Sequence, residues 1–149
     1  MDDLNRRLAL KFGLTAAAAT SLFALATPAE AAAVPNYGPT DGTDLGHGRR
    51  LVEVGVQESQ IDAYKSIKII DIVYQVGAGD PVPAPDDKGM DVDMVCHIIA
   101  GEFTIQKKGI PAYTVKEGGV YTCGKGKTDQ ATNTSNVVGI HRIALLIPA

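Results

Sequence analysis

Apolar and polar residues alternate along several short stretches of the chain, which is the pattern of half-buried β-strands. Leu51–Val56 alternates in this way, and Ile67–Val76 is the longest run of β-branched residues. Pairs of glycines, prolines and Lys-Gly turns separate the stretches. The pattern predicts an antiparallel all-β domain without a helix of convincing length. Its further strands are expected at Asp93–Gly101, Glu102–Lys107, Ala112–Lys116, Val120–Cys123 and Val137–Pro148.

The first residues of the chain follow a different pattern. A charged start, Asn5–Lys11, precedes a moderately apolar run at Phe12–Ala26, and small residues surround Glu30 in Ala29–Ala31. This order is typical of a secretory signal peptide. We therefore predict a signal peptide over residues 1–31, cleavage after Ala31, and a periplasmic or secreted protein.

The charged start resembles the twin-arginine export motif, S/T-R-R-x-F-L-K. Arg6, Arg7, Leu10 and Lys11 match it, whereas Asn5 stands in place of Ser/Thr and Ala9 in place of phenylalanine. The resemblance implies folding before export, and proteins that take up a cofactor in the cytoplasm often use this route. The apolar run is shorter than the roughly 20 residues that a membrane span needs. No stable membrane span is expected after cleavage.

Composition limits the remaining possibilities. The chain has 149 residues, 16 glycines, 8 prolines and a formal charge of −3. This length predicts one domain that can bury a core, and the weak acidity offers no basic face for nucleic acid. Residues 32–50 are rich in Pro, Gly, Asp and Thr and have no apolar period, so a flexible, exposed lead-in is expected there. His47 would be a surface residue within it. The folded domain is then expected over residues 51–149.

The second half of the chain resembles a small cupin, a double-stranded β-helix barrel of the jelly-roll type. The family's second motif is G-x5-P-x-G-x2-H-x3-N. Gly118, Gly126 and Asn133 match it, while Gly124 replaces the proline and Asp129 replaces the metal-binding histidine. The likeness extends from about Ile67 to Leu146.

The family's first motif, G-x5-H-x-H-x3,4-E-x6-G, is less well kept. Its closing glycine falls on Gly101, and counting back places Met94 at the glutamate. The resemblance implies a small single-domain cupin-like barrel that lacks the usual His/Glu metal ligands. The two histidines would fall among Pro85, Asp87, Lys88, Gly89 and Met90, none of which is a histidine.

The resemblance also indicates which side chains face the interior. If the family's glutamate position points inward, strand alternation turns Met94, Cys96 and Ile98 inward and His97 outward. Cys123 precedes Asp129 by a few residues and lies near the same cavity. These side chains are the expected lining of a small-molecule pocket.

Cys96 and Cys123 are the only two cysteines. Three interpretations remain open. The pair can form a disulfide in an oxidising compartment, or the thiols can be small buried side chains. In the third interpretation they bind a soft transition metal, alone or with Met94, His97 or Asp129. The spacing supports no closed zinc site, so the cofactor stays unknown.

Asp129 is the candidate catalytic residue. A carboxylate in the place of a cupin histidine could act as a general base if burial raised its pKa. The alternative is a turn aspartate that Lys125 and Lys127 hold ionised at the surface. The aspartate-rich loop Asp80–Asp91 is interpreted as solvated surface rather than as a cation site. His141 is expected to be structural or to lie at an interface.

Together these observations predict an exported cupin-like binding module for a small molecule. The alternative is a cupin-type enzyme, an oxygenase, isomerase or lyase, that uses a non-standard metal site or Asp129 as base. A homodimer formed through edge strands is a further possibility that the resemblance implies.

Overall fold

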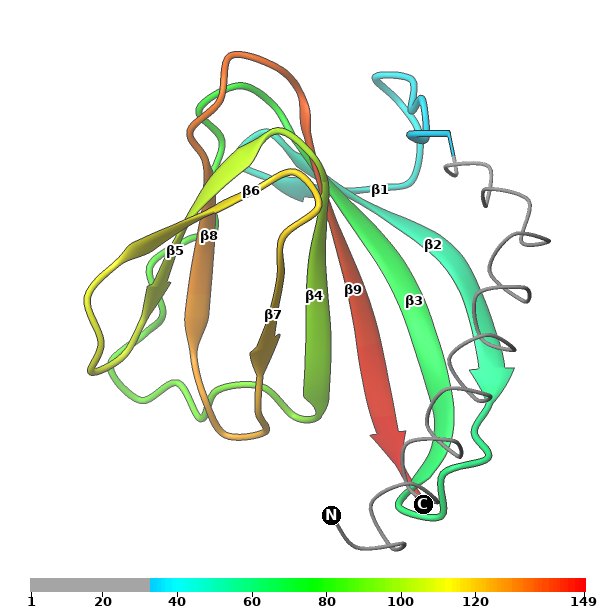
Figure 1. Ribbon diagram of the computed structural model, residues 1–149. Coiled ribbons are helices and arrows are strands. Elements are labelled where there is room, and N and C mark those ends of the chain that lie inside the picture. Colours follow the sequence, from blue (N-terminus) through cyan, green and yellow to red (C-terminus); the bar gives the residue numbers. More distant parts are fainter. Residues whose placement is uncertain (1–32) are drawn as a thin grey trace, which may run out of the picture. The chain divides into compact units, whose positions relative to one another are not determined.

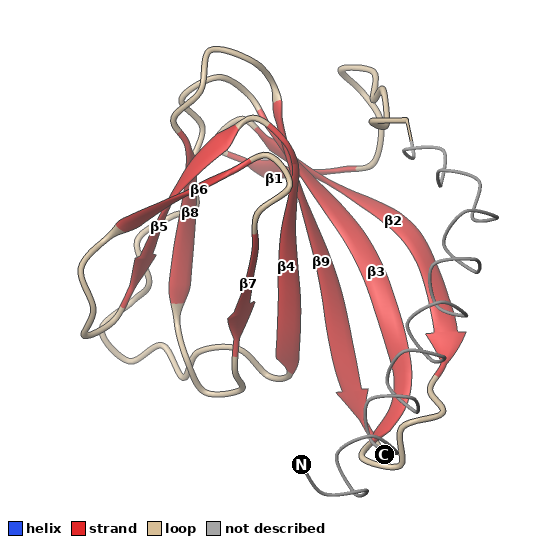
Figure 2. Cartoon of the chain, in the orientation of Figure 1, coloured by secondary structure: helices blue, strands red, loops and turns tan. Residues whose placement is uncertain are grey.

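The protein is a β-barrel built from two sheets, as a computed structural model describes it over residues 33–149 (Figure 1). The predicted signal peptide, residues 1–31, lies outside these residues. The described part contains strands, turns and loops and no helix (Figure 2), so it holds no helix that could cross a membrane. The all-β prediction is confirmed. The strands are β1 (Thr43–Gly46), β2 (Arg49–Glu58), β3 (Tyr64–Tyr74), β4 (Asp93–Ala100), β5 (Glu102–Lys107), β6 (Tyr113–Lys116), β7 (Val120–Cys123), β8 (Asp129–Asn133) and β9 (Gly139–Pro148).

The strands pair antiparallel in two sheets. The larger sheet has the order β1-β2-β3-β9-β4-β7, and the smaller one has the order β6-β5-β8. The last strand, β9, lies between β3 and β4, with Ile143 opposite both Ile70 and Cys96. In Figure 1 the β6-β5-β8 sheet faces β4 and β7, whereas β2, β3 and the end of β9 extend away from it. The C-terminal strand thus joins the two halves of the larger sheet.

The core lies between the two sheets. Cys96 and Ile98 of β4 and Phe103 and Ile105 of β5 have no exposed surface. The rings of Tyr74 and Phe103 meet edge to face, with centroids 5.1 Å apart. Aromatic pairs in this geometry add a favourable electrostatic term to the burial of their apolar area. The apolar side chains that the sequence placed on alternate positions therefore form one core.

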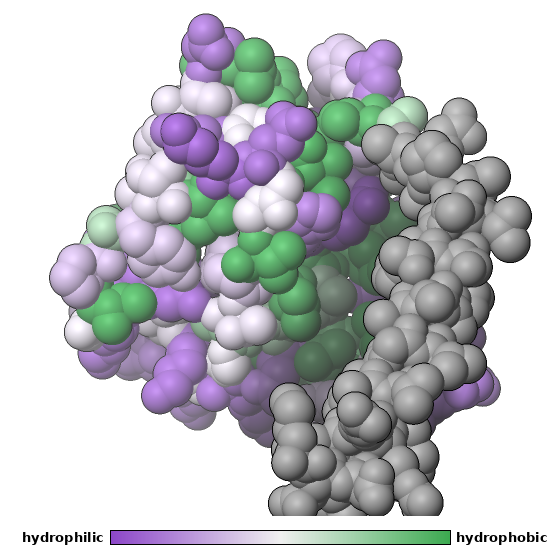
Figure 3. All heavy atoms as spheres, in the orientation of Figure 1, coloured by the Kyte–Doolittle hydropathy of each residue, from purple (hydrophilic) through white to green (hydrophobic). Residues whose placement is uncertain are grey.

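Alternation along β4 and β7 separates the core from solvent. On β4, Met94, Cys96 and Ile98 point inward, whereas Val95 is 36% exposed. On β7, Tyr121 is buried and Val120 is 61% exposed. Figure 3 shows exposed apolar residues interspersed with polar ones on this side of the molecule. The predicted inward orientation of Met94, Cys96 and Ile98 is confirmed.

The barrel begins earlier than the sequence pattern predicted. Part of the expected flexible lead-in forms β1 and the start of β2, joined by a tight turn in which His47 has a φ of 54°. The guanidinium of Arg50 donates hydrogen bonds to the carbonyl oxygens of Thr40, Asp41 and Gly42. All four residues of β1 are exposed. An exposed edge strand has no buried face, so its sequence shows no apolar period.

On the outer face of the larger sheet, Asp71 binds side chains of two other segments. This residue was not identified from the sequence. It lies in the middle of β3 and has no exposed surface. The guanidinium of Arg142 on β9 donates to both of its carboxylate oxygens, at 2.7 and 2.8 Å. The hydroxyl of Tyr37 donates to it as well, at 2.6 Å. This fork-shaped pairing links β3, β9 and the segment before β1, and it raises the pKa of Arg142.

Candidate functional site

Asp129 stands at the start of β8, directly opposite Lys107 of β5. Its Oδ2 atom is buried and has no hydrogen-bond partner among the described residues. Burial raises the pKa of its carboxyl group, and Asp80 raises it further, whereas the Lys107 ammonium lowers it. The carboxyl group is thus partly buried, and both interpretations of Asp129, general base and turn aspartate, stay predictions. Whether Asp129 acts in catalysis stays a prediction.

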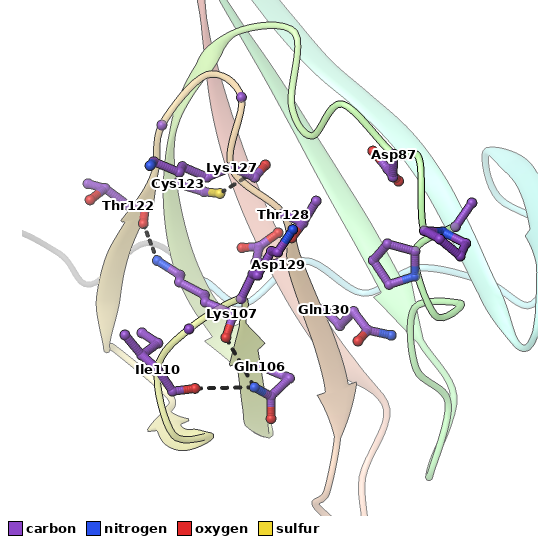
Figure 4. A pocket seen from close by; sticks show the side chains of 17 residues that line it. Asp87, Gln106, Lys107, Ile110, Thr122, Cys123, Lys127, Thr128, Asp129 and Gln130 are labelled. Atoms are coloured by element: carbon purple, nitrogen blue, oxygen red, sulfur yellow. Dashed lines mark hydrogen bonds between the residues drawn. The ribbon is translucent and has the colours of Figure 1, made fainter.

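One cavity lies at the end of the barrel where β5 and β7 end and β8 begins (Figure 4). We call it the end cavity, and its volume is about 710 Å³. Lys107, Lys127 and Asp129 line it, together with Asp87 of the loop between β3 and β4 and Cys123 of β7. In Figure 4 the Lys107 side chain extends to the carbonyl oxygen of residue 122 and binds it. The end cavity thus carries charged groups of both signs, with Lys107 at the end of β5 and Lys127 between β7 and β8.

A second cavity lies along the inward face of the larger sheet, and we call it the sheet cavity. Its volume is about 490 Å³. Arg49, Asp80, Asp87 and His141 contribute polar groups, and Met90 is part of the apolar wall. Asp129 lines both cavities. On the strands of the larger sheet, the apolar wall includes Ile70, Ile72, Met94, Ile143 and Leu145.

Asp80 organises the polar end of the sheet cavity. Its Oδ1 atom accepts hydrogen bonds from Arg49 Nη1 at 2.6 Å and from the Tyr74 hydroxyl at 2.9 Å. Its Oδ2 atom accepts a hydrogen bond from the backbone N–H of Ala131 at 2.8 Å. Asp80 therefore differs from the solvated aspartates predicted for its loop, although Asp86 is exposed as expected. It connects three strands, β2, β3 and β8.

His141 lies inside the barrel and is 3% exposed. Its Nε2 atom is 3.0 Å from the hydroxyl oxygen of Tyr121, and the two rings stack with centroids 5.6 Å apart. Burial lowers the pKa of His141 to about 4, so the ring is neutral at pH 7. Its Nδ1 atom is buried without a partner among the described residues. The alternation along β9 indicates that His141 points inward, because it puts His141 on the same face of the strand as Ile143 and Leu145.

The predicted pocket residues divide into two groups. Met94 and Cys123 line cavities, whereas Cys96 and Ile98 have no exposed surface and belong to the core. Both cysteines are free thiols. Burial raises the pKa of Cys96 to about 12, with Asp129 adding to the effect, and burial also raises the pKa of Cys123. Both groups are thus protonated near neutral pH, which agrees with the interpretation of small buried side chains.

The side chains at the cupin metal positions do not suit a cupin-type metal. Met94 and Asp129, at the glutamate and second-motif histidine positions, both line the sheet cavity. They offer a thioether and one carboxylate, whereas the motif uses imidazole and carboxylate ligands together. Among residues 33–149, no three His, Cys, Asp or Glu side chains are grouped as metal ligands. His97 lies on the opposite face of β4 from these positions.

The fold is similar to that of several solved cupin structures. A search of family models and a search of curated proteins each found no match. An RmlC-like cupin from Shewanella frigidimarina is 17% identical, with a TM-score of 0.56 over 76% of this chain and 89% of that one. KdgF from Halomonas sp. is 12% identical, with a TM-score of 0.55 over 71% and 86%. A predicted oxalate decarboxylase from Thermotoga maritima is 14% identical, with a TM-score of 0.52 over 66% and 80%. The chain therefore has the cupin fold.

Proposed function

We propose that the protein binds a small molecule inside its barrel. The observation that carries this proposal is the buried, unpartnered Oδ2 atom of Asp129 between two cavities. A buried polar atom without a partner destabilises a folded protein, and native proteins have few such atoms. A ligand that donates a hydrogen bond to this oxygen would remove the penalty. The cavity volumes lie in the range typical of small-molecule sites.

The substitution Asp129→Asn tests the proposal. A thermal-shift screen of a metabolite library is expected to find compounds that stabilise the wild type. Their effect should fall at least tenfold in apparent affinity in Asp129→Asn, because the amide cannot supply the same charged acceptor. Asp86→Asn, on the exposed part of the same end of the barrel, is the matched control and should bind as the wild type does. A library that stabilises neither protein would contradict the proposal.

The same substitution should change how stability depends on pH. The carboxyl of Asp129 has a folded-state pKa above its ordinary value of 3.8, so the folded protein binds its proton more tightly than the unfolded chain does. This tighter proton binding stabilises the folded protein below pH 3.8, and the stabilisation is lost as pH rises through the folded-state pKa of Asp129. For this one group, the free energy of unfolding falls by at most about 1.4 kcal/mol per pH unit. Urea unfolding from pH 3 to 8 should show this loss in the wild type, and Asp129→Asn should lack it.

A second candidate function is catalysis with Asp129 as general base. A raised pKa and an oxygen free to accept a proton are what such a base needs. A bound compound that the wild type converts and Asp129→Asn only binds would favour the enzyme. Binding without conversion by either protein would favour the binding module.

Export is part of the proposal and rests on the sequence of residues 1–31. Mass spectrometry of the protein recovered from the periplasm or medium is expected to show a chain that begins at Ala32. Replacing Arg6 and Arg7 with lysine should retain most of the protein in the cytoplasm, because the motif is read by its paired arginines. A full-length chain, or export unchanged by the substitution, would contradict it. A homodimer remains a prediction that light scattering of the mature protein would check.

A further inference from the structure

Three buried polar atoms of the described residues have no hydrogen-bond partner, and all three belong to residues that line the sheet cavity. They are Arg49 Nε on β2, Asp129 Oδ2 on β8 and His141 Nδ1 on β9. These strands are distant in sequence, and the fold brings them to one cavity of about 490 Å³. Isolated unpartnered atoms occur in native proteins, but three in the lining of one cavity call for a common explanation.

The three atoms require both a donor and an acceptor from that group. Arg49 Nε carries a hydrogen and needs an acceptor, whereas the carboxylate oxygen of Asp129 needs a donor. Burial, followed by the nearby Cys96, raises the pKa of Tyr121, so its hydroxyl keeps its proton. When that hydroxyl donates to Nε2 of His141, Nδ1 carries a hydrogen and needs an acceptor as well. A hydroxyl group donates and accepts, and so satisfies each of these atoms.

The charges around the cavity disfavour an anion. The guanidinium of Arg49 is paired with the carboxylate of Asp80 at 2.6 Å, so the two charges offset each other. His141 is neutral at pH 7. The remaining acidic residues of the lining are Asp129 and Asp87, whose carboxylates repel a further negative group. The nearby ammonium of Lys107 donates to a backbone carbonyl at the end cavity instead.

Most of the remaining wall of the sheet cavity is apolar. Ile70, Ile72, Ile143, Leu145 and the two methionines form it. A carbon frame or ring face could therefore contact this wall while its polar edge faces the three unpartnered atoms.

We propose that the sheet cavity binds an uncharged molecule that carries several hydroxyl groups on a compact carbon frame. This inference rests on the proposed function and specifies the chemical class of its ligand. It assigns Arg49 and His141, which no motif indicated, as binding residues beside Asp129. His141 acts through Nδ1, and Arg49 acts through Nε while its Nη1 atom holds Asp80.

The test compares matched six-carbon compounds on the mature protein. Titration calorimetry with myo-inositol, glucose, glucuronate and cyclohexanol separates hydroxyl content from charge. Long-range 1H–15N spectra follow His141 directly, and its signals are identified by their loss in His141→Phe, which keeps the aromatic packing. We expect myo-inositol or glucose to bind at least tenfold more tightly than glucuronate and cyclohexanol. Either compound should shift the Nδ1 signal of His141.

Binding measurements on substituted proteins are the second part of the test. His141→Phe and Arg49→Met should each weaken binding of the neutral compound at least tenfold, whereas the exposed control His47→Gln should bind as the wild type does. Tighter binding of glucuronate, or binding that leaves the His141 nitrogens unshifted, would overturn the inference while leaving small-molecule binding intact. Failure of this panel and of the metabolite library alike, with only ordered water on the three atoms in a crystal structure, would overturn both.

Discussion

Replacing Asn133 with alanine is expected to destabilise the barrel by about 3 kcal/mol, because several buried groups lose their partners together. Asn133 has no exposed surface. Its amide nitrogen donates to the carbonyl oxygens of Tyr74, Gln75 and Val137, at 3.3, 3.2 and 2.8 Å. Its amide oxygen accepts hydrogen bonds from the backbone N–H and the hydroxyl of Ser135. One side chain thus fastens the end of β3 to the connection between β8 and β9.

Urea unfolding of Asn133→Ala measures this effect. The exposed Asn136 lies in the same connection, and Asn136→Ala is the matched control, with an expected change within about 0.5 kcal/mol. A loss below about 1 kcal/mol in Asn133→Ala would mean that water replaces these hydrogen bonds and that the side chain does not hold the two segments together.

Replacing Asp80 with alanine is expected to cost about 3 kcal/mol as well. The substitution leaves a largely buried guanidinium on Arg49, the Tyr74 hydroxyl and the Ala131 N–H without their acceptor. Removing one member of a buried charged pair costs more than the pair contributes, because the other charge stays buried. The substitution should also lower the pKa of Asp129, since Asp80 is one of the groups that raise it.

Two further variants show whether a loss of stability in Asp80→Ala comes from its hydrogen bonds rather than from any substitution in this loop. Tyr74→Phe removes one of the hydrogen bonds and should cost about 1 kcal/mol in urea unfolding. Asp86→Ala, on the exposed part of the same loop, should be neutral within about 0.5 kcal/mol. Equal stability of Asp80→Ala and Asp86→Ala would show that Asp80 belongs to the solvated surface, as its loop sequence suggested.

The fold could be predicted from the sequence because the features that indicate it depend on residues close together along the chain. Alternation turned Met94, Cys96 and Ile98 inward, and Gly101, with a φ of 86°, occupies the turn between β4 and β5. The resemblance to the second cupin motif, which Gly126 and Asn133 match, implied that Asp129 lies near the cavity. Each of these features depends on neighbours within a few residues, so a single strand or turn reveals it.

The polar site depends on pairs that are far apart in sequence. Arg49 and Asp80 are 31 positions apart, and Tyr121 and His141 are 20 apart. Asp80 follows a strand in a loop of prolines and aspartates, which resembles ordinary surface. Only the pairing of β2, β3 and β9 brings Arg49 and His141 to one cavity. Strand registry of this kind is not encoded in any local pattern.

The proposed function depends on the carboxyl of Asp129, which lies between two cavities with its Oδ2 atom buried and unpartnered. Carboxyl 13C NMR titration of the mature, ligand-free protein tests it most directly, with Asp129→Asn identifying the signal. We expect Asp129 to titrate clearly above 3.8. Titration of Asp129 at or below 3.8 would rule out this burial, since it would show a carboxylate that solvent or the neighbouring lysines stabilise.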